Sequence, residues 1–192
     1  MPYFSYAKGD KKDEPRVSIR ARVCADAIEA AGADRVVTID LHAPQIQGFF
    51  RIPVDDLYAL PVLGKAIKSK KLQDPVVVSP DTGFVKQARR YATYLNCNLV
   101  IGDKQRVAHD EQAEVLQIIG DVKGKTALIV DDFTISAGTL VEIAITLVEH
   151  GAKTVYAAVT HGVFAPGTKE RIDDSPITKL LVTDSIETQP TP

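Results

Sequence analysis

The clearest chemistry in the sequence lies where an apolar run ends in two adjacent acids and continues into small residues. Residues 126–140 read TALIVDDFTISAGTL. At the start of a helix, backbone N–H groups and the hydroxyls of Ser136 and Thr139 would surround a phosphate, which unpaired donors and the helix dipole attract. Asp131 and Asp132 would accept hydrogen bonds from vicinal sugar hydroxyls, directly or through a divalent cation. The pattern predicts a sugar-phosphate site, whereas an acidic turn capped by Ser136 would leave the paired acids unexplained.

An alternation of strands and helices must position these residues. Short continuous runs of β-branched and apolar residues predict strands that are covered on both faces. They occupy residues 35–39, 75–79, 98–101, 126–130 and 154–160. Helical spacing of apolar residues predicts helices over 18–31 and 138–150, which stop at Gly32 and Gly151. Strands that alternate with helices indicate an α/β fold with a parallel sheet and helices on its faces.

A change in composition divides the chain into two parts. Prolines and paired acids interrupt the apolar periodicity between residues 51 and 61, so we expect a domain boundary there. Residues 1–54 would form a partial domain, and residues 55–192 would form a complete domain that holds the site. The first part is too short to cover a sheet on both faces, so it reads as the rear part of a domain whose front is absent.

The overall composition describes an ordinary globular protein. The chain has 192 residues, 45% of them hydrophobic and 25% charged, with a formal net charge of −2. This balance gives no reason to expect nucleic acid or an anionic membrane as the main partner. No apolar run approaches the roughly 20 residues of a membrane span, and no secretion signal is visible. Cys24 and Cys97 lack the spacing of metal ligands, so we interpret them as reduced residues with a packing role. Reduced cysteines indicate a reducing compartment, and we therefore expect a cytoplasmic protein.

Further motifs, in order along the chain, resemble those of one enzyme family. They are DLHAPQIQGFF at residues 40–50, SPDTG at 79–83, DKQR at 103–106, IGDVKGKTALIVDD at 119–132 and HGAKTVYAAVTHG at 150–162. On these motifs the chain resembles the ribose-phosphate pyrophosphokinases, which have the type I phosphoribosyltransferase fold. The resemblance implies a Rossmann-like, parallel-sheet domain preceded by the rear part of a second, similar domain. It also implies transfer of diphosphate from ATP to ribose 5-phosphate, giving phosphoribosyl diphosphate and AMP, with Mg²⁺ as cofactor.

The resemblance assigns roles to particular residues. The ribose 5-phosphate site would comprise Asp131, Asp132, Thr134, Ser136, Ala137, Gly138 and Thr139. ATP and its diphosphate would contact Lys8, Asp10, Ser79, Asp81, Gly83 and Arg89. The divalent cation would be bound by His42 and Asp81. Lys104 and Arg106 lie in a polar stretch, residues 104–112, that reads as a mobile loop, and by resemblance they are catalytic, bringing positive charge onto the transferring phosphates.

The sequence departs from the family pattern at three positions. Ile135 stands where most bacterial members have an acid, Lys8 where the pattern has an arginine, and Phe84 in place of the second glycine of a pair. At Lys8 a point charge replaces a planar guanidinium, and at Phe84 a permissive backbone position is lost. We therefore expect contacts to sugar, nucleotide and diphosphate to differ there from the common form.

Two other functions remain open from the sequence. A phosphoribosyltransferase that consumes phosphoribosyl diphosphate would use the same sugar loop, but it gives no role to His42 in its motif. A catalytically silent, associated subunit would bind the sugar phosphate without turning it over. Apolar strands expected at residues 2–6 and 35–39, which a partial domain cannot cover, favour a homo-oligomer, as the resemblance also does. We also expect the chain to be either a form shortened at its N-terminus or one half of a split protein.

Overall fold

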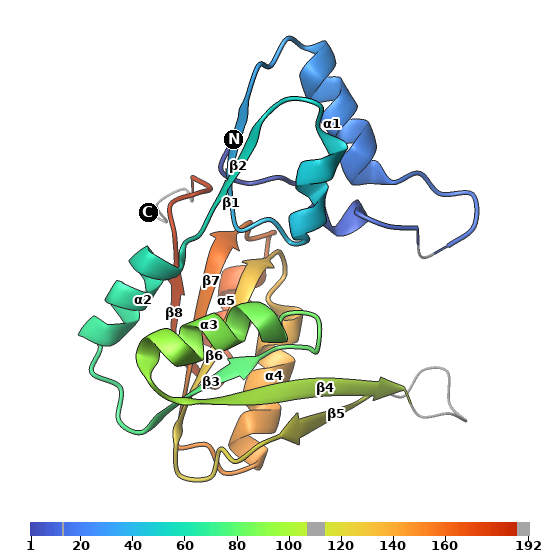
Figure 1. Cartoon of the computed structure of the whole chain (residues 1–192). Helices are drawn as coiled ribbons and strands as arrows, with labels where there is room; N and C mark the ends of the chain where they lie inside the picture. The colour runs from blue at the N-terminus through green and yellow to red at the C-terminus, as the bar shows by residue number, and fades with distance from the viewer. Residues whose placement is uncertain (13, 107–113, 188–192) are drawn as a thin grey trace. The chain divides into compact units, whose positions relative to one another are not determined.

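The chain forms two compact units, and Figure 1 traces the chain from blue at its N-terminus to red at its C-terminus. The computed structural model describes residues 1–12, 14–106 and 114–187. The first unit comprises residues 1–59 with 185–187, and the second comprises residues 60–184. The division expected between residues 54 and 55 falls inside a strand of the first unit, because the strand runs from Val54 to Leu57.

The first unit has a two-stranded parallel sheet beside one long helix. Its elements are η1 (Ala7–Gly9), α1 (Arg20–Ala30), β1 (Val36–Ile39), η2 (Pro44–Phe49) and β2 (Val54–Leu57). Strands β1 and β2 pair along their whole length. Ala21 and Ala25 of α1 are fully buried against a cluster that includes Ile46. In this cluster the rings of Phe4 and Phe50 meet edge to face, with centroids 6.0 Å apart.

The N-terminal segment differs from the prediction. We expect a strand over residues 2–6, but the segment turns and leads into η1. The Pro2 carbonyl accepts the Ile39 N–H at 3.0 Å, so the start of the segment does run beside β1. Turning the chain buries Phe4 and Ala7 together, at 3% and 5% exposure. An extended segment would send these two side chains to opposite faces, because side chains alternate along a strand.

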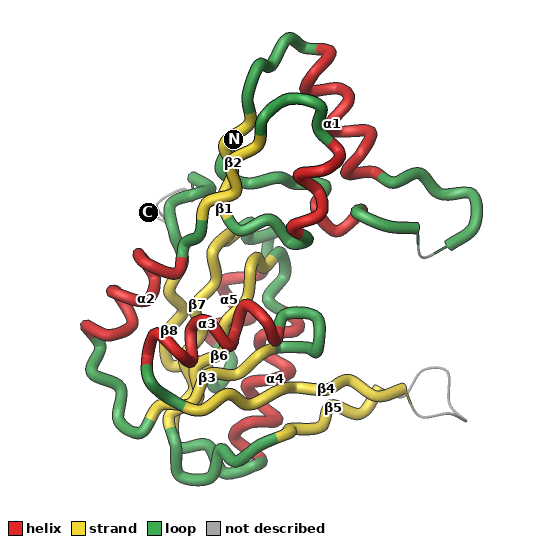
Figure 2. Tube along the Cα trace, viewed as in Figure 1, coloured by secondary structure: helices red, strands yellow, loops and turns green. Residues whose placement is uncertain are grey.

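The second unit is built around a six-stranded sheet, whose strands are among those drawn in yellow in Figure 2. They are β3 (Pro75–Ser79), β4 (Asn98–Arg106), β5 (Glu114–Ile119), β6 (Thr126–Thr134), β7 (Thr154–Gly162) and β8 (Ile177–Val182). Their order across the sheet is β5-β4-β3-β6-β7-β8, and each neighbouring pair is parallel except β4 with β5. The α/β class and the largely parallel sheet expected from the sequence are confirmed.

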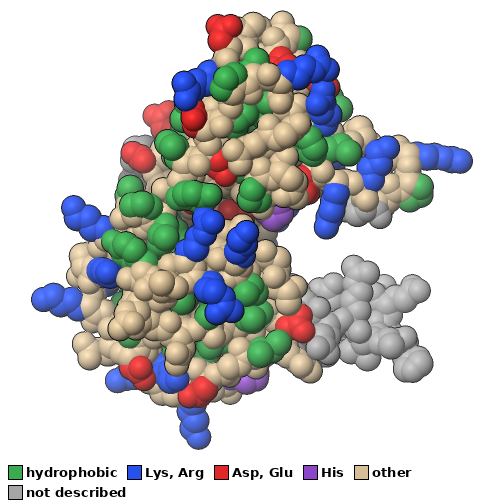
Figure 3. All heavy atoms as spheres, in the orientation of Figure 1, with side chains coloured by type: hydrophobic (Ala, Val, Ile, Leu, Met, Phe, Trp, Pro, Cys, Tyr) green, Lys and Arg blue, Asp and Glu red, His purple; other side chains and the backbone are tan. Residues whose placement is uncertain are grey.

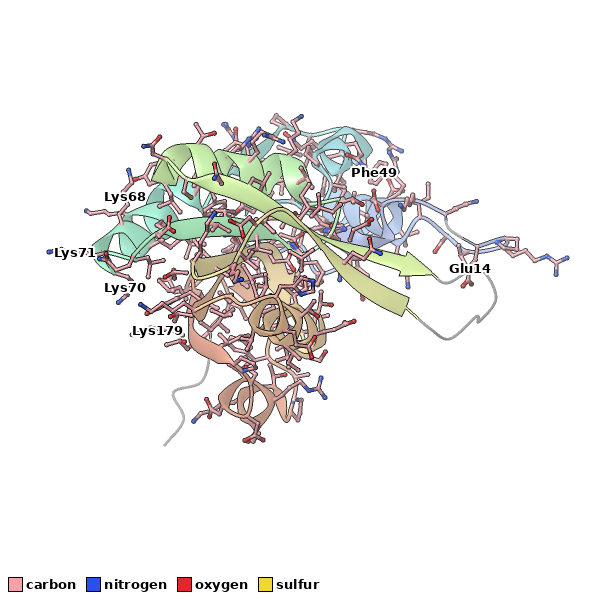
Figure 4. All side chains as sticks on the ribbon, turned by 90° about the horizontal axis from the view of Figure 1, so that it is seen from below. Glu14, Phe49, Lys68, Lys70, Lys71 and Lys179 are labelled. Carbon is pink, nitrogen blue, oxygen red and sulfur yellow. The ribbon has the colours of Figure 1, made fainter. Side chains whose placement is uncertain are left out.

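Helices lie on both faces of this sheet. They are α2 (Leu60–Ser69), α3 (Val85–Leu95), α4 (Gly138–Glu149) and α5 (Thr168–Asp173). Helix α3 connects β3 to β4, whereas α4 connects β6 to β7 in the opposite direction across the sheet. Since such connections are right-handed, α3 and α4 must lie on opposite faces. Figure 4, seen from below, shows the sheet between these two helices.

The central strands are buried on both sides, which explains their continuous apolar sequence. Val76 and Val78 of β3 pack in one cluster with Leu147 of α4. Val77 lies between them in sequence and therefore faces the other side of the sheet, beside Leu128 in the parallel register. Val77 and Leu128 have no solvent exposure, so both faces of the sheet are covered.

Three strands are longer than the sequence predicts. Strand β4 continues to Arg106 and pairs with the antiparallel β5, so Lys104 and Arg106 lie on a strand and not in a mobile loop. Residues 107–112 of the expected loop lie outside the described residues. Strands β6 and β7 pair as far as Thr134 opposite Gly162. The apolar run marks the buried part of a strand, whereas backbone hydrogen bonding continues through the polar residues that follow.

The two helices expected from the sequence end where predicted. Helices α1 and α4 are followed by Gly32 and Gly151, which have left-handed φ angles of +94° and +87°. The N–H groups of these glycines donate to carbonyls of the last helical turn, each at 2.9 Å. Glycine adopts this conformation without a steric penalty, so it closes the helix end.

Both cysteines are free thiols, as the sequence predicts. Burial raises the pKa of the Cys24 thiol and that of the Cys97 thiol. The protonated thiol is the less reactive form, and Cys24 packs against the buried cluster of the first unit.

The charged side chains include both signs on the face shown in Figure 3. This distribution agrees with the small formal net charge of −2. Among the helices of the described residues, none has the length and apolar character needed to cross a membrane.

We predict that Leu147→Ala destabilises the second unit by about 2–5 kcal/mol, because it opens a cavity in the core cluster. Leu147 has no solvent exposure, whereas its neighbour Val148 is 45% exposed. Val148→Ala is therefore the matched control, and it should change the free energy of unfolding by less than about 0.5 kcal/mol. Urea unfolding followed by circular dichroism measures both. Equal losses in the two variants would contradict the orientation of α4.

Candidate functional site

The carboxyl ends of β3 and β6 mark the point where the connections of the sheet change direction. From β3 the chain crosses through α3 to β4 on one side, and from β6 it crosses through α4 to β7 on the other. In open α/β sheets, ligands bind outside the carboxyl ends of strands at such a point. The pairing of β3 with β6 ends at Val78 opposite Ile129, whereas β6 continues to Thr134 beside β7. Asp131 and Asp132 therefore lie beyond the last pair with β3.

Asp131 and Asp132 form a tight acidic pair at this end of β6. The Asp132 N–H donates to Oδ1 of Asp131 at 3.0 Å, and the Phe133 N–H donates to Oδ1 of Asp132 at 2.9 Å. Burial raises the pKa of Asp131 well above its usual range, and the carboxylates of Asp132 and Asp81 raise it further. Asp132 is only 4% exposed. Two negative charges at this place would be costly without partners, and hydroxyl donors or a cation would stabilise them.

The loop after β3 brings a third acid to the same place, since Asp81 is close enough to raise the pKa of Asp131. Ser79 is fully buried, and its hydroxyl donates to the Asp81 carbonyl at 2.8 Å. The Phe84 N–H donates to Oδ1 of Asp81 at 2.9 Å. A Cβ at Gly83 would lie 3.1 Å from this Oδ1, so the glycine leaves room for the carboxylate. The structure therefore joins Ser79, Asp81 and Gly83 in one ordered turn.

The loop between β6 and α4 is shaped to present backbone N–H groups. Thr134 is buried, and its Oγ1 accepts the Ala137 N–H at 3.1 Å. Ala137 is the N-cap of α4 in a left-handed conformation, φ +57°, and its side chain makes no capping hydrogen bond. Ser136 and Thr139 are exposed, and the Gly138 N–H lies 3.4 Å from Oγ of Ser136. An anionic group at this surface would meet the amide donors and the positive end of the helix dipole.

The residues assigned by resemblance in the first unit lie on two neighbouring segments. Lys8 is exposed in η1, and Asp10 follows that element. The side-chain amide of Gln45 donates to Oδ2 of Asp10 at 3.1 Å, which ties this segment to η2. His42 is exposed between β1 and η2. The fold of this unit thus brings Asp10 close to the segment that carries His42.

Three cationic residues assigned to phosphate contacts lie on other elements of the second unit. Arg89 is exposed on α3. Lys104 and Arg106 lie at the end of β4, where the register places them opposite Leu116 and Glu114 of β5. The structure describes the backbone of this part of β4 and not its side chains.

Sequence reasoning missed two residues that hold the sugar-phosphate loop in place. Oγ1 of Thr168 donates to the Ile135 carbonyl at 2.9 Å, and Nη1 of Arg171 donates to the Ser136 carbonyl at 3.0 Å. Both donors belong to α5, 33 and 35 residues further along the chain than their acceptors. Local spacing carries no signal of contacts between segments so far apart in the sequence.

The second unit therefore combines two kinds of group at the carboxyl ends of its central strands, β3 and β6. The acidic pair accepts hydrogen bonds, and the helix amides donate them. In the part of the chain that the structure describes, no three His, Cys, Asp or Glu side chains are arranged to hold a metal ion. The arrangement suits a ligand that carries a phosphate beside neighbouring hydroxyls, as a sugar phosphate does.

Solved structures identify the fold class. The crystal structure of phosphoribosylpyrophosphate synthetase from Mycobacterium smegmatis matches with a TM-score of 0.90 and 38% identity, covering 100% of this chain and 63% of that chain. The crystal structure of APRTase from Giardia lamblia matches with a TM-score of 0.51 and 19% identity, covering 65% of this chain and 77% of that chain. The second likeness concerns the fold alone. The chain has the fold of the type I phosphoribosyltransferases.

Sequence relatives narrow this class to one family. A family described as the N-terminal domain of ribose phosphate pyrophosphokinase matches residues 1–32, and one described as the phosphoribosyl synthetase-associated domain matches residues 104–190. Ribose-phosphate pyrophosphokinases of Caldanaerobacter subterraneus and Bacillus subtilis are 52% and 48% identical over 187 residues, 97% of this chain. The chain spans 59% of the length of each relative. It is a homologue of the ribose-phosphate pyrophosphokinases.

We predict that Asp131→Asn stabilises the protein at pH 8 and that this gain shrinks on acidification. The pKa of Asp131 is raised in the folded state by burial and by its acidic neighbours. The folded state is therefore favoured below the unfolded pKa of about 3.9 and loses stability as the pH rises through the higher folded value. The amide keeps an oxygen that can accept the Asp132 N–H. Thermal unfolding of the variant and of the parent at pH values from about 4 to about 8 measures the difference in stability between them.

Asp121→Asn is the control with the opposite sign. The Lys123 N–H and the Lys125 ammonium lower the pKa of Asp121, so neutralising that side chain should give no gain at pH 8. Equal stability of Asp131→Asn and the parent across this pH range would show that Asp131 carries no destabilising charge.

Proposed function

We propose that this chain carries out the transfer of diphosphate from ATP to ribose 5-phosphate, giving phosphoribosyl diphosphate and AMP. The observation that carries the proposal is the acidic pair Asp131 and Asp132, which lies directly before the amide-presenting loop at the start of α4. Relatives that are about half identical to this chain are named ribose-phosphate pyrophosphokinases. In the proposed reaction, the anomeric hydroxyl of the sugar attacks the β-phosphorus of ATP. The bond from that phosphorus to the α–β bridging oxygen breaks, and AMP leaves.

The ribose 5-phosphate would bind beyond the carboxyl end of β6, beside the first turn of α4. Its phosphate would accept hydrogen bonds from the loop formed by Thr134, Ser136, Ala137, Gly138 and Thr139, where the helix dipole favours a negative charge. Its ring hydroxyls would donate to Asp131 and Asp132. This orientation fixes the anomeric hydroxyl relative to the diphosphate, and such positioning contributes much of the catalysis in phosphoryl transfer.

The contacts proposed for the nucleotide are those that the resemblance implies. In the second unit, the turn formed by Ser79, Asp81 and Gly83 would hold the diphosphate, with Arg89 as a further phosphate contact. In the first unit, Lys8 and Asp10 would contact the nucleotide. These assignments rest on the resemblance to the family and on the ordered turn after β3.

Mg²⁺ is the cofactor that this reaction would use. Carboxylate oxygens are ligands that Mg²⁺ prefers, and it commonly binds one or two carboxylates together with substrate phosphates. Burial raises the pKa of Asp131 and the carboxylates of Asp132 and Asp81 raise it further, so a cation nearby would favour the charged form of this side chain. By resemblance, His42 and Asp81 would hold the ion. When bound, Mg²⁺ supplies positive charge that stabilises the phosphate oxygens during transfer.

The proposal extends to assembly and location. The resemblance to the family implies a homo-oligomer, and the exposed apolar side chains Leu57 and Tyr58 of the first unit, at 51% and 53% exposure, would suit association. We therefore propose a cytoplasmic homo-oligomer that uses ATP and ribose 5-phosphate and has neither nucleic acid nor membrane as its partner.

We predict that ribose 5-phosphate stabilises the chain and that AMP forms when ATP and Mg²⁺ are also present. At a ligand concentration 100 times the dissociation constant, the gain in unfolding free energy is about 2.7 kcal/mol. Asp131→Asn and Asp132→Asn should weaken this stabilisation, because each removes an acceptor for a ring hydroxyl. Thermal unfolding and chromatographic detection of AMP give the two readouts.

The outcomes distinguish the candidate functions. AMP release identifies a diphosphokinase. Binding of ribose 5-phosphate without AMP release identifies a sugar-phosphate-binding subunit, and formation of a nucleotide from phosphoribosyl diphosphate and a base identifies a phosphoribosyltransferase. A chain that ribose 5-phosphate does not stabilise at all would rule out the proposed sugar site.

We predict that Lys104→Ala and Arg106→Ala lower kcat much more than they weaken the binding of ribose 5-phosphate. Positive charge that acts on the transferring diphosphate stabilises the transition state in preference to the bound substrate. Steady-state kinetics with both substrates and Mg²⁺ measures the split between kcat and KM. An increase in KM for the sugar at unchanged kcat would identify these residues as substrate-binding groups and would contradict the catalytic role.

A further inference from the structure

One segment of the second unit donates hydrogen bonds to the backbone of the sugar-phosphate loop, residues 134–139. We name residues 163–171 the brace. Three consecutive carbonyls of the loop accept hydrogen bonds from it, at 2.8 to 3.0 Å. The pairs are Val163 N–H to the Thr134 carbonyl, Ala165 N–H and Thr168 Oγ1 to the Ile135 carbonyl, and Arg171 Nη1 to the Ser136 carbonyl. The loop is thus fixed through its backbone by residues remote in the sequence.

The hydrogen bonds from the brace also determine the orientation of the backbone N–H groups of the loop. In a planar trans peptide the N–H lies opposite the preceding carbonyl, and the described chain has no cis peptide bond. Because the carbonyls of Thr134, Ile135 and Ser136 point to the brace, the N–H groups of residues 135–137 point away from it. The Ala137 N–H is taken by Oγ1 of Thr134. The N–H groups of Ile135 and Ser136 are left facing the side opposite the brace.

Arg171 differs from the other donors of the brace because it brings a charge to the loop. A Cβ built on Gly138 would lie 3.8 Å from Nη1 of Arg171, so the guanidinium sits against the first turn of α4. The N-terminal end of a helix carries a partial positive charge, and a cation beside it is unfavourable. An anion bound at the loop would be attracted by both the guanidinium and the helix end, and it would remove this repulsion.

We propose that Arg171 is a positioning residue that strengthens the binding of a phosphate group at the loop. Its guanidinium holds the peptide between Ser136 and Ala137 in place and adds positive charge beside the first turn of α4. This inference rests on the proposed function, since it specifies which part of the sugar phosphate the loop recognises. It assigns a role in substrate binding to α5, a helix that the sequence motifs leave without one.

Arg171→Met tests the role, because it keeps most of the apolar stem and removes both the charge and the donor. We expect the dissociation constants of ribose 5-phosphate and of inorganic phosphate to rise about tenfold or more, as the loss of a charge-assisted interaction does. Arg171→Lys restores the charge without the planar fork and should recover part of the affinity. In kinetics, KM for the sugar phosphate should rise, while KM for ATP and kcat stay close to those of the parent.

Lys179→Met is the matched control. Lys179 is exposed on β8, on the flank where Lys68, Lys70 and Lys71 also project (Figure 4). The Lys179→Met substitution removes one positive charge from the same unit at a place away from the loop, so the affinity for phosphate should not change. Amide NMR shifts of residues 135–139 on addition of inorganic phosphate report the loop directly, and Arg171→Met should diminish them selectively.

Two outcomes would overturn the inference in distinguishable ways. If the parent binds ribose 5-phosphate and Arg171→Met and Arg171→Lys bind it equally well, Arg171 has no positioning role, although the proposed function stands. If the parent binds neither ribose 5-phosphate nor inorganic phosphate, the sugar-phosphate site and the role of Arg171 fail together. Thermal unfolding of each variant without ligand establishes that the comparison is made between folded proteins.

Discussion

The site depends on the register between two parallel strands. The pairing of β3 with β6 stops at Val78 opposite Ile129, while β6 runs on beside β7 to Thr134. This difference in length places polar residues beyond the buried part of the sheet while one neighbouring strand still holds their backbone. A β6 that ended with its pairing to β3 would leave Asp131 and Asp132 in an unsupported loop. The extension holds the backbone of both acids in place, and such fixed positioning is what binding and catalysis require.

Charge of both signs is held within the same small region by different means. The negative charge comes from the carboxylates of Asp131, Asp132 and Asp81; burial raises the pKa of Asp131, and the other two acids raise it further. The positive charge comes largely from the backbone, through the start of α4, with the guanidinium of Arg171 beside it. A ligand of complementary charge would reduce the repulsion within each cluster. Groups with strongly shifted pKa values cluster at functional sites, which agrees with a binding site here.

Sequence reasoning predicted the parts of the fold that leave a local pattern. The buried strands were recognisable from continuous apolar runs, and β3 has the predicted bounds, Pro75–Ser79. The glycines after α1 and α4 were recognisable because a left-handed helix end favours that residue. The sugar-phosphate site was predicted from the order of its residues along the chain, in which a buried strand is followed by two acids and then by small residues that begin a helix. The β4–β5 hairpin, the extension of β6 and the contacts of Thr168 and Arg171 were missed, since they depend on pairing between distant segments.

The conformation of Ala137 has a consequence for the entropy of the loop. A residue with a Cβ in the left-handed region costs of order 1–3 kcal/mol, a cost that glycine would avoid. Glycine, however, would populate many more backbone states in the unfolded chain and in any partly opened loop. An alanine at this position narrows that ensemble, so less ordering remains to be done when a ligand arrives. The strain at one residue thereby lowers the entropic cost of binding for the whole turn that precedes α4.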